Sequence, residues 1–208
     1  METLMFLSVV SMHLTRRNSS LIFLYTAQSL IISAALFRSS YQEASLMLML
    51  VALITLMVKV ILAPWFFFGL IRKHRLQFSV STQLNAPMTF IVLAALTAFS
   101  FSHLFQPLAV LAPDNGKTLL LALAMMFVSI FLIINRKGAL SQMAGILSLE
   151  NSIVSFAYVA GLESTVGPKI GILFDILVWV VIATVFASMI YKHFGSLDVS
   201  EMNQLREE

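Results

Sequence analysis

Hydrophobic residues fill this chain in long stretches, and short polar or basic stretches separate them. A helix that crosses a membrane needs about 20 apolar residues, with a range of roughly 17–25. By this measure the pattern predicts seven helices, at about residues 1–15, 19–38, 44–71, 88–106, 118–135, 139–162 and 169–192. The first is short. We interpret it as a retained helix, because no basic residue precedes its apolar run and no cleavage-type site follows it.

The third predicted helix is long and contains Pro64. Proline has no backbone N–H, so Pro64 leaves the carbonyl of Val60 without its helical partner, and we expect a kink at this point. The aromatic run that follows, at residues 65–68, is expected to face lipid or a neighbouring subunit.

The composition agrees with a membrane protein. Of the 208 residues, 59% are hydrophobic and only 11% are charged, whereas soluble domains carry about 25% charged residues. The expected fold class is therefore an all-α, polytopic membrane helical bundle. The sequence holds no cysteine, no HExxH and no GxGxxG motif, so we expect no cofactor, no metal site and no catalytic residues in this chain.

Basic residues predict the orientation of the bundle. After predicted helices one, three, five and seven come most of the Lys and Arg residues: Arg16, Arg17, Arg72, Lys73, Arg75, Arg136, Lys137 and Lys192, with Arg206 in the tail. The opposite loops hold only Arg38, Lys117 and Lys169. The positive-inside rule then places the C-terminus in the cytoplasm and the N-terminus outside.

The same spacing suggests an internal division of the chain. A shift of 120 residues places Arg16–Arg17 on Arg136–Lys137, so helices one to three would correspond to helices five to seven in the same orientation. The regular alternation of basic loops explains this spacing equally well. We divide the chain into a three-helix unit at 1–75, a connecting helix and loops at 76–117, a second three-helix unit at 118–194 and a cytoplasmic tail at 195–208.

Three ionisable residues fall inside predicted spans: Lys59, Glu150 and Asp175. A charge at the centre of a span costs at least ~2.5–3.5 kcal/mol on insertion scales, so each is a candidate functional residue. Buried acids and lysines can change charge near neutral pH and can pass protons between them. The alternative is a structural ion pair, such as Lys59 with Glu150. Three charges that sum to minus one cannot all be paired, and this favours an ion relay.

Four further polar residues are candidates for supporting the relay: Gln28, Tyr25, Asn151 and Gln142. Gln28 and Tyr25 are three residues apart on one helix and therefore share a face. Asn151 and Gln142 flank Glu150. A stripe of small residues, Ser141, Gly145, Ser148, Ser152 and Ser155, lies roughly opposite Glu150 and is typical of close helix packing.

The C-terminal stretches RKGALSQMAGILSLENSIVSFAYVAG and KIGILFDILVWVVIATVFASMIYKHFGSLDVSEM resemble the last helices and tail of the hydrogenase-4 component E family. Weaker similarity extends over the whole chain, including YTAQSL at 25–30 and MVKVILAP at 57–64. The C-terminal half also resembles the small K chain of respiratory complex I and the C subunit of the multi-subunit Na⁺/H⁺ antiporters.

The resemblance implies a non-catalytic membrane subunit of a formate hydrogenlyase or group 4 hydrogenase-type complex, in the cytoplasmic (inner) membrane of a prokaryote. The implied partners are antiporter-like membrane subunits, a subunit like the quinone-site membrane chain, and peripheral hydrogenase subunits that hold the nickel–iron and iron–sulfur centres. No role with nucleic acid is expected.

In the K chain, two membrane glutamates on successive helices are implicated in proton transfer. The resemblance places Asp175 at the second of these positions, with Asp replacing Glu. The first position falls at Leu147, one helical turn before Glu150. Residues one turn apart share a face, so we expect Glu150 to take this role. Two alternatives remain open: a purely structural connector between antiporter-like subunits and the redox module, and a free-standing ion carrier. The transported ion, H⁺ or Na⁺, the electron donor and the subunit stoichiometry also stay open.

Overall fold

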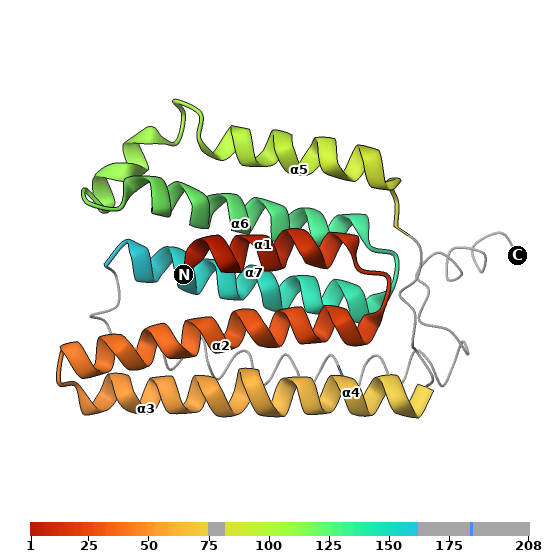
Figure 1. The fold of residues 1–208 in the computed structure, drawn as a ribbon, viewed down its shortest axis with the longest axis horizontal. Coiled ribbons are helices and arrows are strands. Elements are labelled where there is room, and N and C mark those ends of the chain that lie inside the picture. The colour runs from red at the N-terminus through yellow and green to blue at the C-terminus, as the bar shows by residue number, and fades with distance from the viewer. Residues whose placement is uncertain (75–81, 162–183, 185–208) are drawn as a thin grey trace, which may run out of the picture.

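The computed structural model describes residues 1–74, 82–161 and 184, and the regular elements in this part of the chain are all helical (Figure 1). In chain order they are α1 (Glu2–Leu14), α2 (Asn18–Gln42), α3 (Leu46–Thr55), the π-helix η1 (Leu56–Leu62), α4 (Ala63–His74), α5 (Ala86–Ser100), the 3₁₀-helix η2 (Gln106–Leu111), α6 (Gly116–Asn135) and α7 (Ala139–Val159). The expected helical class is confirmed for these residues. The helix expected at 169–192 and the tail at 195–208 lie outside them.

The third predicted helix corresponds to α3, η1 and α4, which follow one another without a break (Figure 1). At the end of η1, the N–H of Ala63 donates to the carbonyl of Val58, five residues earlier. Pro64 follows directly and has no N–H to donate. A kink was expected at Pro64; the structure instead has a π-helical segment before Pro64, and α3, η1 and α4 continue in one direction (Figure 1).

Local sequence explains several of the helix boundaries. The Ser45 hydroxyl accepts a hydrogen bond from the N–H of Leu48 and caps α3, and the Asn85 side chain accepts from Met88 and caps α5. After α7, Gly161 adopts a left-handed conformation with φ of 68°, which suits glycine and ends the helix. The expected helix at 88–106 was too long: α5 stops at Ser100, and turns followed by η2 occupy residues 101–111.

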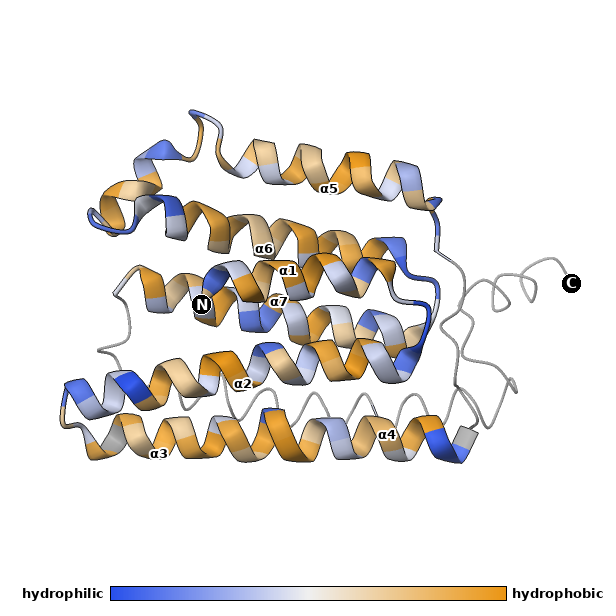
Figure 2. Ribbon diagram, in the orientation of Figure 1, coloured by the Kyte–Doolittle hydropathy of each residue, from blue (hydrophilic) through white to orange (hydrophobic). Residues whose placement is uncertain are grey.

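Three of the described helices are long and apolar enough to cross a membrane: Asn18–Gln42, Leu48–Lys73 and Gly116–Asn135. The helices α1 and α5 are apolar but shorter. The last described helix, α7, has 21 residues, several of them polar. Figure 2 shows hydrophobic residues along most of each helix and hydrophilic residues gathered at the two ends of the bundle. This pattern is the one expected of a membrane-embedded bundle.

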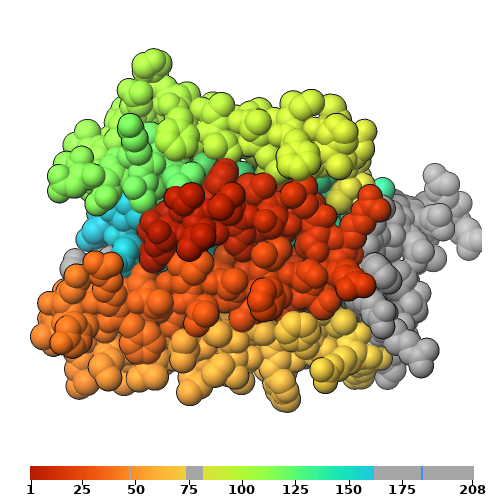
Figure 3. Space-filling view, in the orientation of Figure 1, coloured from red at the N-terminus to blue at the C-terminus, as the bar shows by residue number. Residues whose placement is uncertain are grey.

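The helices pack side by side, with α7 and α2 at the centre. The most extensive pairing is between α6 and α7, and α2 packs against both α7 and the α3–α4 rod. The short helix α1 contacts both α2 and α6, and Figure 3 shows it on one face of the molecule between α2 and α5. Polar side chains on α2, η1 and α7 therefore face the interior of the bundle.

Alternate helices run in opposite directions, so α1, α4 and α6 all end at the same side of the bundle (Figure 1). This side holds Arg16 and Arg17, Arg72 and Lys73, and Arg136 and Lys137. We refer to it as the basic end. The opposite end holds Arg38 and Lys117. The expected clustering of basic residues at one end is thus present in the described residues.

Two helical hairpins, α1–α2 and α6–α7, have the same direction and similar short turns, at residues 15–17 and 136–138. Their equivalent helices also contact each other, α1 with α6 and α2 with α7. This arrangement fits the first two helices of the 120-residue repeat. The third pair of the repeat involves the helix expected at 169–192, which lies outside the described residues.

Candidate functional site

A buried ion pair joins η1 to α7 at the centre of the bundle. The Lys59 ammonium lies 2.5 Å from a carboxylate oxygen of Glu150, and the two side chains are 1% and 18% exposed. Both residues were expected in the relay on the basis of sequence. In a low-dielectric interior such a pair is stable only when both charges are well coordinated.

Asn151 gives Lys59 a second partner. Its side-chain oxygen accepts a hydrogen bond of 3.0 Å from the Lys59 ammonium, and its side-chain nitrogen donates one of 3.0 Å to the Ser29 hydroxyl. Asn151 and Ser29 are both fully buried. A continuous polar network thus runs from Glu150 through Lys59 and Asn151 to Ser29, linking η1, α7 and α2.

The local backbone places Lys59 in this network. Lys59 belongs to the π-helical segment, in which hydrogen bonds span five residues instead of four. A π-helical segment changes the direction of its side chains relative to a regular α-helix, and such segments often mark functional sites. The sequence predicted a kink at Pro64 but did not predict the π-helical segment that contains Lys59.

Tyr25 and Gln28 lie on α2 close to Ser29, and both side chains are 0% exposed. The Gln28 amide nitrogen donates a hydrogen bond of 3.4 Å to the carbonyl of Met5 in α1. Both expected supporting residues on α2 therefore face the interior, beside the network.

Gln142 does not join this network. Its side-chain nitrogen donates a hydrogen bond of 2.8 Å to the backbone carbonyl of Arg136, in the turn before α7. Gln142 lies eight residues from Glu150, which is ~12 Å along a helix. Its observed role is to stabilise the turn at the basic end. Asp175, the third expected relay residue, lies outside the described residues.

The stripe of small residues on α7 packs closely against α6, as expected. An added Cβ at Gly145 would lie 2.8 Å from the side chain of Ile133. Just along the stripe, the Ser129 hydroxyl lies 3.2 Å from that of Ser148 and 3.3 Å from that of Ser152. Ser129 belongs to α6, so Ser148 and Ser152 lie on the side of α7 that faces α6. All three hydroxyls are fully buried.

Apolar clusters lie on both sides of the polar network. One cluster includes Met12, Leu21, Ile22, Phe67, Leu140, Ala144 and Leu147, and most of it lies toward the basic end. The other includes Met5, Ile32, Leu36, Ala52, Ala122 and Met125, toward the opposite end. Phe67 is 1% exposed and belongs to the first cluster, so the expectation that the whole aromatic run faces outward is wrong for this residue. Trp65, at 67% exposed, does face outward.

Arg136 has a structural role that sequence reasoning missed. Its guanidinium donates hydrogen bonds to three backbone carbonyls at the end of α1, and the residue is 2% exposed. Burial lowers the pKa of Arg136 from its ordinary value. Nearby, the His13 ring stacks on Phe131, and its Nε2 lies 3.1 Å from the carbonyl of Val128. These contacts tie the two hairpins together at the basic end.

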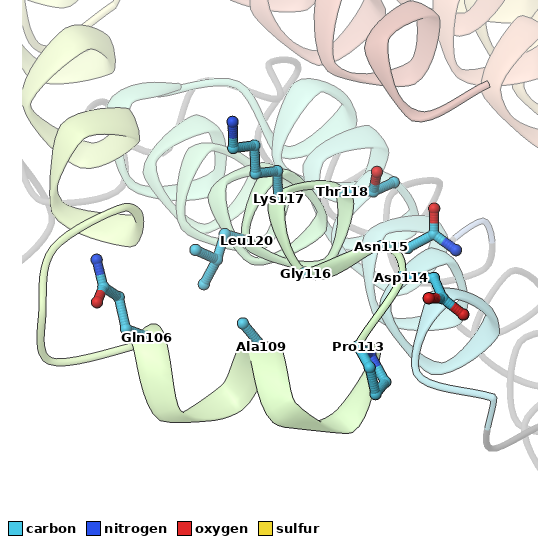
Figure 4. Close-up of a pocket in the computed structure, with 9 residues that line it drawn as sticks. All are labelled: Gln106, Ala109, Pro113, Asp114, Asn115, Gly116, Lys117, Thr118 and Leu120. Carbon is cyan, nitrogen blue, oxygen red and sulfur yellow. The ribbon is translucent and has the colours of Figure 1, made fainter.

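A surface pocket lies at the other end of the bundle, between η2 and the start of α6 (Figure 4). Gln106, Asp114 and Lys117 are among the residues that line it. Because Glu150 lies in the middle of α7, this pocket is separate from the ion pair. Among the described residues, no group of three or more His, Asp or Glu side chains is arranged to hold a metal ion.

Comparison with known proteins finds a weak relative. The chain is 25% identical over 162 residues to the uncharacterized protein Rv0085 of Mycobacterium tuberculosis, and the match covers 77% of this chain and 73% of that protein. No protein-family model matches the chain. No solved structure matches it either.

Proposed function

We propose that this chain is a membrane-arm subunit of a redox-linked complex of the group 4 hydrogenase or complex I type, and that its buried ion pair takes part in moving protons or sodium ions. The observation that supports the relay most strongly is the Lys59–Glu150 pair with its extension through Asn151. The complex class is supported by the resemblance of the chain to hydrogenase-4 component E. In this proposal the chain lies in the cytoplasmic membrane of a prokaryote with its basic end inside.

The network offers a simple proton cycle. A proton that reaches Glu150 converts the carboxylate to an acid and removes the negative charge from the pair. Lys59 stays charged and keeps Asn151 as its hydrogen-bond acceptor. The pair then carries one positive charge in a low-dielectric setting, which favours release of the proton to the next acceptor. By the resemblance, Asp175 is that acceptor or the preceding donor.

The partners in this proposal supply the redox chemistry. They are antiporter-like membrane subunits, a quinone-site-like membrane subunit and peripheral subunits with nickel–iron and iron–sulfur centres. A tagged copy, expressed at native level and purified in mild detergent, should bring down hydrogenase or other iron–sulfur subunits with an antiporter-like chain. A solitary homo-oligomer would contradict the proposal and favour a free-standing ion carrier.

A structural connector is the second candidate function. The observation that favours it is that Lys59, Asn151 and Ser29 join three helices through direct hydrogen bonds. The two functions predict different results for Glu150→Gln. A relay predicts an assembled complex that no longer couples ion movement to electron transfer. A connector predicts reduced assembly, with normal coupling in the complexes that form. Glu43→Gln, an exposed carboxylate after α2, is the matched control.

A further inference from the structure

Two buried polar atoms beside the network have no hydrogen-bond partner among the described residues: the Tyr25 hydroxyl and the Gln28 carbonyl oxygen Oε1. Both side chains are 0% exposed. An unpaired polar atom in the interior loses its contact with water and gains nothing in return, so nearly all such atoms in native proteins are paired. The two residues are three apart on one helix, so their side chains share a face and one small partner can reach both.

The orientation of the Gln28 amide is fixed by its neighbour in α1. The carbonyl of Met5 can only accept a hydrogen bond, so the end of the amide that faces it must be the nitrogen. The carbonyl oxygen Oε1 is therefore the end left without a donor. The Tyr25 hydroxyl can act as donor or acceptor. A small molecule that accepts from Tyr25 and donates to Gln28 would satisfy both residues.

We propose that Tyr25 and Gln28 bind a buried water molecule that continues the polar network beyond Ser29. Water matches the requirement because it donates two hydrogen bonds and accepts two, and buried waters usually make about three. Ser29 lies one helical turn from Tyr25 on the same face of α2, and its hydroxyl accepts from Asn151, so it connects the water site to the ion pair. This water site deepens the proposed relay, and its functional meaning rests on that proposal.

The position of the site gives the network a direction. Tyr25 lies one helical turn before Ser29, which is ~6 Å nearer the basic end at 1.5 Å per residue. Beyond Tyr25 on α2 come the buried apolar side chains Leu21 and Ile22. The water would therefore occupy the last polar position on this face of α2 before the apolar cluster toward the basic end.

A double-mutant cycle tests whether one molecule joins the two residues. Tyr25→Phe and Gln28→Leu each leave the other residue unpaired, so each should lower the unfolding temperature of the purified protein in lipid nanodiscs. The double variant should lose less than the sum of the two shifts, because it removes both polar groups. Additive shifts would overturn the proposal. Tyr41→Phe, at the exposed end of the same helix, should leave the unfolding temperature unchanged.

Infrared spectroscopy detects the water directly. It can be applied to the wild type even if a variant fails to fold. The wild type should show an internal O–H stretching band that shifts on exchange into H₂¹⁸O. This band should disappear in Tyr25→Phe and in Gln28→Leu and persist in Tyr41→Phe. Absence of the band in the wild type, or its survival in both interior variants, would overturn the water site. Loss of coupling in Glu150→Gln is measured separately, so the relay and the water site can fail independently.

Discussion

Arg136 at the end of α6 donates a hydrogen bond of 2.6 Å to the backbone carbonyl of Met12 near the end of α1. The same guanidinium nitrogen also reaches the carbonyls of His13 and Thr15, at 3.1 and 2.8 Å. A helix leaves its last carbonyls without intrahelical partners, and a cation at this position also interacts favourably with the helix dipole. One side chain from the second hairpin therefore caps a helix of the first.

Removing this cap should destabilise the bundle. Because Arg136→Ala leaves buried carbonyls without their charged donor, we expect a loss of about 1.5–3 kcal/mol in the free energy of unfolding. Chemical unfolding in detergent measures the change. Arg16→Ala, at an exposed arginine of the same end, should change stability by less than about 0.5 kcal/mol. Equal losses in the two variants would contradict a capping role for Arg136.

The close contact between α6 and α7 predicts a second effect. Gly145→Ala places a methyl group 2.8 Å from the Ile133 side chain, and overpacking of this kind typically costs about 1–3 kcal/mol. Gly69→Ala is the matched control, since an added Cβ there has no neighbour within 4 Å. It should be neutral or stabilise α4 by up to about 1 kcal/mol. Thermal unfolding of the two variants distinguishes a tight interface from a general intolerance of larger residues.

The ion pair predicts strong non-additivity. Lys59→Met leaves Glu150 without its cation, and breaking a buried pair in this way typically costs about 3–5 kcal/mol. The double variant Lys59→Met/Glu150→Gln removes both charges and should regain most of that stability. Unfolding experiments on the two single variants and the double variant give the coupling energy. A coupling energy near zero would mean that the two residues do not interact in the membrane.

The π-helical segment predicts an effect at a distance from the charges. Pro64→Ala restores a backbone N–H to the helix and removes one reason for the irregular hydrogen bonding of η1. If η1 becomes α-helical, Lys59 is displaced by as much as one residue of rotation, about 100°. We expect ion movement to fall roughly tenfold to a hundredfold, the usual effect of misplacing a functional group. Pro87→Ala, in the first turn of α5, should leave ion movement unchanged.

Among the described residues, the sequence was sufficient to predict the helices apart from the end of α5, because their length and hydropathy are dictated by the apolar stretches themselves. It also identified Lys59 and Glu150, because charges inside apolar stretches are conspicuous. Their direct contact could only be offered as one alternative, since the π-helical segment that directs Lys59 depends on backbone hydrogen bonds with no clear sequence signal.

The sequence patterns around three other residues, Arg136, Gln142 and Ser29, did not predict the contacts that these residues make. Arg136 belongs to a basic pair at a helix end, a pattern that indicates membrane orientation and gives no sign of a buried cap. Gln142 precedes Glu150 on the same helix, but eight residues separate the two side chains, and Gln142 binds the turn instead. Ser29 was one of many serines, and only the contact with Asn151 shows its place in the network.

In the proposed relay, protonation of Glu150 takes part in ion movement. The most direct test is ion uptake by the purified complex in proteoliposomes during electron transfer, compared between wild type, Glu150→Gln and Glu43→Gln. We predict that Glu150→Gln assembles normally and transfers electrons without coupled ion uptake, while Glu43→Gln behaves as wild type. Undiminished uptake per electron in an assembled Glu150→Gln complex would contradict the relay.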